Sequence, residues 1–311
     1  MISDSILWAR CSEEGPYFCT VYKNAYFSLA NHLKFMIYSI CYDRISERRK
    51  IIELSAKNIQ VAYQQKNVIS DLSIAFEPNK ITTIIGANGC GKSTLLKALT
   101  RLWPVTQGKV TLDGRPLLSW DTKEIARRIA FLPQSPKLTT ATKVYDLVSY
   151  GRYPYQKGFG RLTAGDKQKI DWALELTATE HLKDNLVEEL SGGQRQRVFI
   201  AMTLVQDTDI IVLDEPTTYL DMNHQLEIME ILQKLKQEEN KTIIMVLHDL
   251  NLAARFSDKL VAMSAGKIVK QGGVSEVMTP EVLREVFRIN AQLIPDPTSG
   301  RPLLLNYQLC K

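Results

Sequence analysis

Residues 80–102, with the sequence KITTIIGANGCGKSTLLKALTRL, join a strand-like run to a helix-like run through a glycine-rich turn. The first run is rich in β-branched residues and stops at Gly86, and the second has apolar residues at helical spacing. The turn itself, GANGCGKST, fully matches the phosphate-binding pattern GxxxxGK[ST]. Because a strand precedes the turn and a helix follows it, the stretch predicts an α/β fold built around a phosphate-binding loop, the P-loop.

The residue types of the P-loop each suit one task. Its glycines let backbone N–H groups converge on phosphate oxygens, and the helix N-terminus adds positive potential. We expect Lys92 to reach the β and γ phosphates and Ser93 to bind Mg²⁺. Cys90 is a tolerated small side chain, or a thiol made reactive by the nearby dipoles. The predicted nucleotide-binding residues here are Gly86, Ala87, Asn88, Gly89, Cys90, Gly91, Lys92, Ser93 and Thr94.

Two carboxylates at the end of another apolar run are the next candidates. The run DIIVLDEPT (209–217) contains Asp214 and Glu215 where its apolar part stops. Adjacent acids in a loop are usually just solvated, but an unliganded charge at the end of a buried strand would be costly. We therefore expect Asp214 to hold Mg²⁺, usually through water, and Glu215 to polarise an attacking water.

Gln134 and His248 are candidates because of the residues around them. Gln134 ends AFLPQ, from where its side chain could reach the magnesium ion or the water, although most glutamines are surface polar groups. His248 follows the apolar run TIIMVL (242–247), where a histidine is more often structural than catalytic. Their chemistry therefore depends on which groups the fold brings beside them.

Strand-like and helix-like segments alternate along most of the chain. IELSAKNIQVAY (52–63) and ISDLSIAFEP (69–78) alternate apolar and polar residues as half-buried strands do. Residues 135–189 are mostly helix-like and hold Thr163 and Asp166 at capping-box spacing, which suggests a helical insertion. The alternation indicates a parallel α/β sheet, whose ligands bind at the carboxyl ends of the strands.

Shorter signals complete the local picture. Asp113-Gly114 predicts a hairpin turn, and HQLEIMEILQKLKQ (224–237) predicts an amphipathic helix. From about Ser264, the strand-like pieces GKIVKQG and PLLLNY flank the helix-like PEVLREVFRI.

The composition sets outer limits. The 311 residues, 45% hydrophobic and 23% charged, are typical of a soluble globular protein, and a net charge of +5 is only mildly basic. Five cysteines without metal-ligand spacing favour reduced thiols in a cytoplasmic compartment. The most apolar segment, 26–42, is interrupted by polar residues, so we expect an extension or an upstream start, with a peripheral membrane helix as the alternative.

The segment LSGGQ (190–194) is a second glycine-rich cradle at a predicted helix start, and with it the chain resembles the ATP-binding-cassette (ABC) family. The resemblance runs from about Ile51 to about Ala265, and the motifs stand in the family's order. They are Tyr63, the P-loop, Gln134, LSGGQ, Asp214 with Glu215, Asp221 and His248.

The resemblance implies a fold and a division of the chain. The expected fold is a P-loop NTPase with a mixed central sheet, an N-terminal antiparallel β subdomain and an inserted helical subdomain at about 135–189. The nucleotide-binding domain would span 51–265, with 266–311 as a C-terminal extension of the same domain. Residues 1–50 would be an N-terminal extension of uncertain status.

The resemblance also implies a shared site. Two copies would pair head to tail, so that each ATP lies between one copy's P-loop and the other copy's Ser191, Gly192, Gly193 and Gln194. Tyr63 would stack on adenine, and Asp221 would make a cross-dimer contact, left open because TYLD replaces the commoner small-residue sequence. The predicted catalytic residues are Lys92, Gln134, Glu215 as base or water positioner, and His248 as γ-phosphate sensor. The predicted Mg²⁺ ligands are Ser93, Gln134 and Asp214.

A finer resemblance, including GRYPYQKGFG (151–160) and the tail DPTSGRPLLLNY (296–307), is to the ATPases of ferric-siderophore importers of the hydroxamate and catecholate class. It implies ATP and Mg²⁺ as ligands, separate membrane permease subunits, an indirect link to an extracytoplasmic substrate-binding protein, no nucleic acid, and a peripheral place on the cytoplasmic face of the cell membrane. Residues 135–189 would receive coupling helices of the permease, with the groove near Gln134 as the contact. The alternative is that 151–160 is merely a basic surface loop. A cobalamin or haem importer, or a soluble regulatory or nucleic-acid-associated cassette, is the alternative.

Overall fold

The structure is a computed structural model, and it describes residues 52–63, 66–136, 141–156 and 161–310. The predicted N-terminal extension, residues 1–50, and the apolar segment within it lie outside the described residues.

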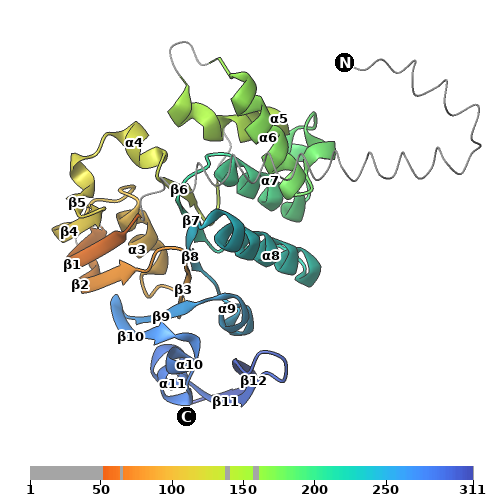
Figure 1. The fold of residues 1–311 in the computed structure, drawn as a ribbon. Coiled ribbons are helices and arrows are strands. Elements are labelled where there is room, and N and C mark those ends of the chain that lie inside the picture. The colour runs from red at the N-terminus through yellow and green to blue at the C-terminus, as the bar shows by residue number, and fades with distance from the viewer. Residues whose placement is uncertain (1–51, 64–65, 137–140, 157–160, 311) are drawn as a thin grey trace, which may run out of the picture. The chain divides into compact units, whose positions relative to one another are not determined.

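Within the described residues, the strands form three sheets (Figure 1). The antiparallel sheet has the order β2-β1-β4-β5 and consists of Lys66–Phe76, Leu54–Tyr63, Gln107–Leu112 and Arg115–Pro116. The central sheet has the order β10-β9-β3-β8-β7-β6 and consists of Lys267–Gly273, Lys259–Ser264, Ile81–Gly86, Thr242–Val246, Ile210–Asp214 and Ile129–Leu132. The third sheet is a hairpin of β11, Ile289–Pro295, and β12, Pro302–Leu309.

The helices flank the central sheet and form the segment between β6 and β7. Those packed near the sheet are α3 (Lys92–Leu99), α4 (Thr122–Ala126), α8 (Met222–Glu239), α9 (Leu250–Phe256), α10 (Val274–Val277) and α11 (Pro280–Phe287), together with the short η1 (Leu117–Ser119). Those between β6 and β7 are α5 (Val144–Ser149), η2 (Tyr150–Tyr155), α6 (Ala164–Leu176), η3 (Glu180–Leu182), η4 (Val187–Glu189) and α7 (Gly192–Leu204). The exact division into subdomains stays a prediction.

The central sheet separates two hydrophobic cores, because alternate residues of its strands face opposite sides. On β7, Ile210 and Val212 pack with α3 and the antiparallel sheet, while Ile211 and Leu213 pack with α7, α8 and α9. Figure 1 shows α3 and α8 on opposite sides of these strands. Burial of each such side chain stabilises the fold by about 1.5–3 kcal/mol. A strand buried on both faces reads as a continuous apolar run, as the sequence does here.

The sheet is mixed, as the family resemblance predicted, whereas alternation of strands and helices alone indicated a parallel sheet. β9 pairs in parallel with β3 but antiparallel with β10. The reason is the short connection at Ala265 and Gly266, whose φ angles of 47° and 76° form a tight turn. A connection of two residues can join only antiparallel strands.

Two local predictions are confirmed in detail. Asp113 and Gly114 have φ angles of 51° and 73° in the turn between β4 and β5, the left-handed conformation that a two-residue hairpin requires. Thr163 and Asp166 form a capping box at the start of α6, with each side chain accepting the other residue's backbone N–H. Both turns place the elements that follow them.

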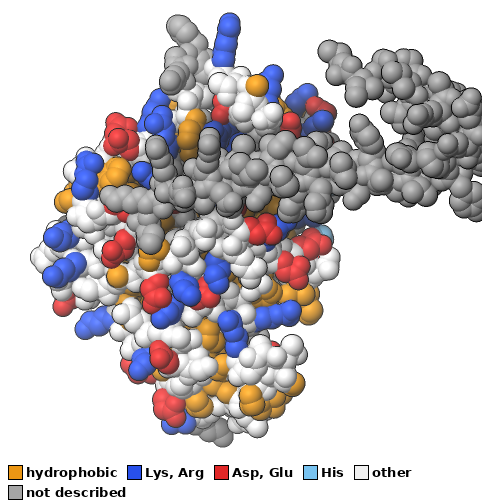
Figure 2. Space-filling view, in the orientation of Figure 1, with side chains coloured by type: hydrophobic (Ala, Val, Ile, Leu, Met, Phe, Trp, Pro, Cys, Tyr) orange, Lys and Arg blue, Asp and Glu red, His pale blue; other side chains and the backbone are white. Residues whose placement is uncertain are grey.

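The surface carries mixed charge. On the face shown in Figure 2, basic and acidic side chains are interspersed, and hydrophobic side chains gather over the C-terminal elements at the lower end of the view. Leu305, Tyr307 and Leu309 of β12 are among the exposed apolar residues. Within the described ranges, every helix is too short or too polar to cross a bilayer.

Candidate active site

The parallel strands of the central sheet end at one edge, and the predicted catalytic residues follow four of those ends. β3 leads into the P-loop, and β7 ends at Asp214. Gln134 follows β6, and His248 follows β8, each after one intervening residue. Since β6, β7, β8 and β3 are parallel neighbours, their carboxyl ends bring these side chains to the same place.

The P-loop is folded around the ammonium group of Lys92. Its Nζ donates hydrogen bonds to the carbonyl oxygens of Gly86 at 2.8 Å and Ala87 at 3.1 Å. Lys92 is 6% exposed, and no ion pair in the described part of the chain includes it. Ala87, Asn88 and Gly89 are exposed around it. A buried cation held by carbonyl dipoles at a helix N-terminus fits an anionic phosphate.

The shape of the P-loop depends on glycines that cannot be replaced without strain. Gly91 is the N-cap of α3 and has a φ of 107°, in the region that glycine adopts readily and other residues avoid. A Cβ on Gly86 would collide with the carbonyl oxygen of Met263 on the neighbouring β9. Backbone conformation at one position and close approach at the other therefore fix the shape of the loop.

Cys90 lies beneath the loop and is 7% exposed. Burial raises the pKa of its thiol, so the group stays protonated near neutral pH. A reactive cysteine needs a lowered pKa, and the structure therefore favours the small-side-chain interpretation of this residue.

Asp214 and Ser93 stand side by side at the end of β7. The Ser93 hydroxyl donates to Asp214 Oδ1 at 3.0 Å, and Asp214 is 1% exposed. Burial raises the pKa of Asp214, and the charge of Glu215 raises it further against the hydrogen bond from Ser93. No cluster of three or more His, Cys, Asp or Glu in the described ranges could hold a metal alone. One hydroxyl and one carboxylate suit Mg²⁺, which takes its other ligands from phosphates and water.

Glu215 is the centre of the site. Its Oε2 accepts hydrogen bonds from Gln134 Nε2 at 2.6 Å and Thr218 Oγ1 at 3.2 Å, and its Oε1 lies 2.5 Å from His248 Nε2. Glu215 is 7% exposed and has a φ of 57°. A left-handed conformation at a residue other than glycine is held by its surroundings and is common at functional sites. The arrangement can orient and deprotonate a water molecule.

Thr218 is a site residue that the sequence reasoning missed. It lies three residues after Glu215 in the same turn, and its backbone N–H also donates to the Glu215 carbonyl at 3.3 Å. A hydroxyl at this short spacing from a carboxylate was the available signal.

Tyr63, the predicted adenine-stacking residue, ends β1 with 51% of its surface exposed. The Trp103 ring lies 5.3 Å away at 35°, and Trp103 Nε1 donates to the carbonyl oxygen of Ala62 at 3.2 Å. A second ring thus supports the exposed one, which gives a flat apolar surface suited to a base. No spacing in the sequence pointed to Trp103.

The signature turn, residues 190–194, begins α7 with a capping box. Ser191 Oγ accepts the Gln194 N–H at 3.2 Å, and Gln194 Oε1 accepts the Ser191 N–H at 3.0 Å. Ser191 and Gly192 are exposed. The start of α7 is therefore open to solvent, where an anion from outside the chain can reach it.

The neighbours of the signature turn come from the segment 219–220. A Cβ on Gly192 would lie 3.7 Å from Tyr219 Cβ, and one on Gly193 would lie 3.4 Å from Leu220 Cδ2. Tyr219 is 74% exposed and has a φ of 67°. The turn thus packs against this segment, and the P-loop packs against the sheet edge.

Asp221 has a local role in addition to the predicted one. It is the N-cap of α8, accepting the His224 N–H at 3.0 Å, and His224 Nδ1 lies 2.7 Å from its Oδ1. The hydrogen bond from the His224 backbone lowers the pKa of Asp221. Its predicted contact across a dimer stays a prediction.

Comparison with known proteins places this site in a family. A model of the ABC transporter family matches residues 69–218. The iron(3+)-hydroxamate import ATP-binding protein FhuC of Bacillus subtilis is 48% identical over 258 residues, which cover 83% of this chain and 96% of FhuC. The chain belongs to the ABC transporter ATP-binding proteins. The cassette is therefore a transporter ATPase, as the sequence predicted.

Solved structures agree with this assignment. A metal-chelate type ABC transporter in an inward-facing conformation has a TM-score of 0.70 and 28% identity, covering 82% of this chain and 97% of that chain. The dimeric structure of a bacterial ABC transporter cassette has a TM-score of 0.65 and 26% identity, covering 71% and 98%. The predicted P-loop NTPase fold, with its antiparallel and mixed sheets, is confirmed.

Proposed function

We propose that this cassette hydrolyses ATP to drive the import of ferric hydroxamate siderophores through a separate membrane permease. The observation that carries the proposal is Glu215, buried at the sheet edge and held between Gln134 and His248 beside the P-loop. The similarity to FhuC, named as an iron(3+)-hydroxamate import protein, supplies the cargo class.

The nucleotide would lie along the edge from Tyr63 to the P-loop. Tyr63 would hold the adenine ring, and Lys92 would exchange its contacts with the loop carbonyls for phosphate oxygens. Ser93 and Asp214, with Gln134 nearby, would hold Mg²⁺, which neutralises phosphate charge when bound. Glu215 would then orient the attacking water, and His248 would sense the γ-phosphate.

The signature turn supports a head-to-tail pair. In the described contacts, no lysine and no carboxylate paired with a serine stands beside this turn, so alone it would supply only half of a phosphate site. A second copy that brings its P-loop to this turn would complete the site, and the pair would contain two such sites. The related cassette of known structure is dimeric.

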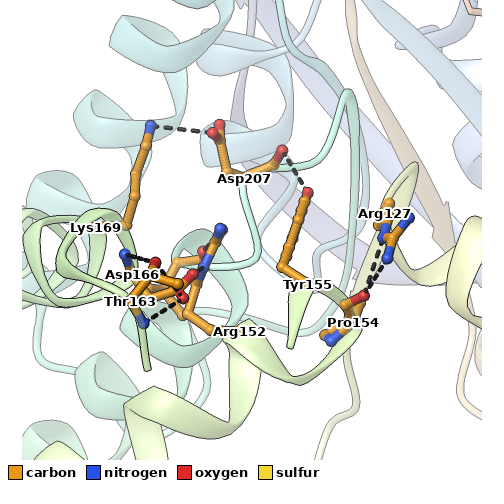
Figure 3. Close-up of polar contacts among 9 residues, drawn as sticks. Arg127, Arg152, Pro154, Tyr155, Thr163, Asp166, Lys169 and Asp207 are labelled. Atoms are coloured by element: carbon orange, nitrogen blue, oxygen red, sulfur yellow. Dashed lines mark hydrogen bonds and ion pairs between the residues drawn. The ribbon is translucent and has the colours of Figure 1, made fainter. Parts of the chain in front are cut away.

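The segment η2 supports docking of a permease. Arg152 is 8% exposed, and it donates through Nε to Asp166 at 2.8 Å and through Nη1 to the Val205 carbonyl at 2.9 Å (Figure 3). The network fixes η2 against α6 and the end of α7. It leaves Tyr150 and Tyr153 on the surface, 59% and 63% exposed.

Arg127 ties the same segment to α4. Its Nε and Nη2 donate to the Pro154 carbonyl at 2.9 and 2.8 Å, and the Tyr155 ring lies between the guanidinium groups of Arg127 and Arg152 (Figure 3). Because η2 is attached both to the helical segment and to α4, a movement of the permease against η2 would be transmitted to the central sheet. Through that contact the cassette would be peripheral on the cytoplasmic side of the membrane.

The test is uptake of radioactive iron in cells whose only copy of the cassette carries Glu215→Gln. We expect loss of uptake from ferric hydroxamates while the variant protein remains at the membrane. Catecholate chelates, cobalamin and haem are measured in parallel. Selective loss for one of those cargoes would reassign the substrate, and normal uptake of every cargo would contradict a role in transport.

A further inference from the structure

The tail motif DPTSGRPLLLNY forms the turn and most of the second strand of the hairpin β11–β12, and this strand contacts the helix α9 beside the active site. Asp296 and Arg301 close the turn between β11 and β12, with the Asp296 N–H donating to the Arg301 carbonyl at 2.8 Å. Asp296 also accepts the N–H groups of Thr298 and Ser299 at 3.3 Å each, and Gly300 has a φ of 66°. The turn is therefore rigid, and it holds Arg301 in place.

Arg301 holds the C-terminal end of α9. Its Nη1 lies 3.0 Å from the Ala254 carbonyl oxygen, 2.8 Å from that of Arg255 and 2.8 Å from that of Ser257. The last carbonyls of a helix have no partners within the helix, and they carry partial negative charge. One cation from the hairpin satisfies these groups at the end of α9.

Asn251 joins the N-terminal end of α9 to the same hairpin. The Leu304 N–H donates to Asn251 Oδ1 at 2.8 Å, and Asn251 Nδ2 donates to the Leu304 carbonyl at 3.2 Å. The amide side chain thus pairs with β12 as a neighbouring strand would. Together with Arg301, this pair attaches both ends of a seven-residue helix to one hairpin.

The helix so held begins at Leu250, two residues after His248. Asp249 caps α9, accepting the N–H groups of Asn251 and Leu252 at 2.8 and 2.9 Å, so a shift of α9 moves the residue before the cap. His248 Nε2 lies 2.5 Å from Glu215, but 46% of the His248 side chain is exposed. Since packing covers only about half of this side chain, its position depends on the backbone that carries it.

We infer that Arg301 and Asn251 are positioning residues for ATP hydrolysis, because the hairpin β11–β12 fixes α9 and thereby holds His248 against Glu215. The inference rests on the roles proposed for His248 and Glu215. It assigns to the tail motif a task in the chemical step, which acts through α9 and His248, whereas the P-loop follows the neighbouring strand β3.

The test measures ATP hydrolysis by the full chain carrying Arg301→Ala or Asn251→Ala, each alone and combined with His248→Ala. A displacement of about 1 Å in a catalytic group can lower a rate up to about 100-fold, so we expect kcat to fall about tenfold with KM for ATP changed less than twofold. In the His248→Ala background the same substitutions should change kcat less than twofold, because the residue they position is gone.

Two controls separate positioning from general stability. Arg284→Ala removes an exposed arginine of α11 and should leave kcat unchanged, and Arg301→Lys keeps a donor at the helix end and should recover part of the loss. Equal loss of kcat with and without His248, or an increase in KM alone, would overturn the inference. If His248→Ala by itself has no effect, the role proposed for His248 fails instead.

Discussion

The cassette contains two glycine-rich turns at helix N-termini, and their surroundings differ. The P-loop turn has a buried lysine, a serine beside a buried aspartate, and the carboxylate of Glu215, which directly follows that aspartate at the end of β7. The signature turn has the same exposed N–H groups, but its capping box is made by its own Ser191 and Gln194. The first turn therefore lies beside groups that can bind phosphate and activate water. The second offers a helix N-terminus without such groups.

In the proposed head-to-tail pair, one chain would contribute two halves of a site that do not meet within it. Both halves use the same physics, a helix N-terminus that attracts an anion. Only the P-loop half has groups that can activate water. An ATP that needs both halves must therefore lie between two chains, and each half can be broken separately.

The largest expected effect is on the rate of ATP hydrolysis, when one variant chain has a defective P-loop half and another has a defective signature turn. Glu215→Gln removes the base, and Gly192→Asp places a carboxylate at the signature turn, where it would repel phosphate while suiting the helix N-terminus. Each variant alone should hydrolyse ATP about 10²- to 10⁴-fold more slowly than the wild type. An equimolar mixture should regain activity, because one of the two sites in a mixed pair has both halves intact.

Hydrolysis rates of the separate and mixed variants measure this directly. Mixing Glu215→Gln with wild type at the same total concentration is the control for dilution. Rates in the mixture no higher than those of the separate variants would mean that both halves act within one chain.

The second prediction concerns the backbone of the P-loop. Gly91→Ala forces a side chain to a φ of 107°, which should lower the free energy of unfolding by about 1–3 kcal/mol and abolish tight ATP binding. Gly165→Ala is the matched control in α6, where the nearest atom to a new Cβ is Thr163 Oγ1 at 3.8 Å. Gly165→Ala should raise the free energy of unfolding by about 0.5–1 kcal/mol. Urea unfolding measures the free energy of unfolding of both variants. Equal changes in the two variants would contradict backbone strain at Gly91.

The sequence predicted much of the P-loop half, and the reason is local. A strand, glycines at fixed offsets and a helix define the loop within one short stretch, so spacing alone was sufficient. Asp214 and Glu215 were found because charges at the end of an apolar run are costly without ligands. Gln134 and His248 were weaker candidates, since each gained meaning only from strands that are distant in the sequence and adjacent in the sheet.

The contacts that fix the site were harder to predict. Trp103 behind Tyr63, and Arg301 at the end of α9, are brought in by long-range packing that leaves no periodic or spacing signal. Asp221 shows the opposite limit, because the family resemblance suggested a contact outside the chain while its contact within the chain is a helix cap. Patterns along a sequence report local constraints, and such contacts depend on the assembled fold.

A third prediction concerns the far end of the signature helix, where Asp207 follows α7. Burial alone would raise the pKa of Asp207, but the ammonium groups of Lys241 and Lys169 at 3.0 Å outweigh it and hold the pKa well below its ordinary range. A lowered folded-state pKa stabilises the protein above the unfolded pKa, and the stability is lost as the pH falls. Asp207→Asn should cost about 2 kcal/mol at pH 7 and flatten the pH dependence below about pH 5.

Urea unfolding between pH 7 and pH 3 checks this expectation, with the exposed Asp184→Asn as the control in the same helical region. An unchanged acid slope in Asp207→Asn would contradict the ion-pair account. ATP binding at pH 7 should stay within a factor of two, because Asp207 lies at the end of α7 opposite the signature turn.

The smallest expected effect is on stability, and it tests the comparison of the two turns most directly. It separates two tasks of Ser191, capping α7 and facing a phosphate of a second chain. Ser191→Ala removes the cap of α7 and should lower the free energy of unfolding by about 1 kcal/mol. Ser191→Asp keeps an oxygen that can cap the helix, so its stability should stay within about 0.5 kcal/mol of the wild type. The new charge would nevertheless repel a phosphate, and ATP-dependent pairing in a Glu215→Gln background should be lost. Urea unfolding without nucleotide and sedimentation with ATP measure the two properties, and a Ser191→Asp chain that still pairs would show that the turn does not face the phosphate.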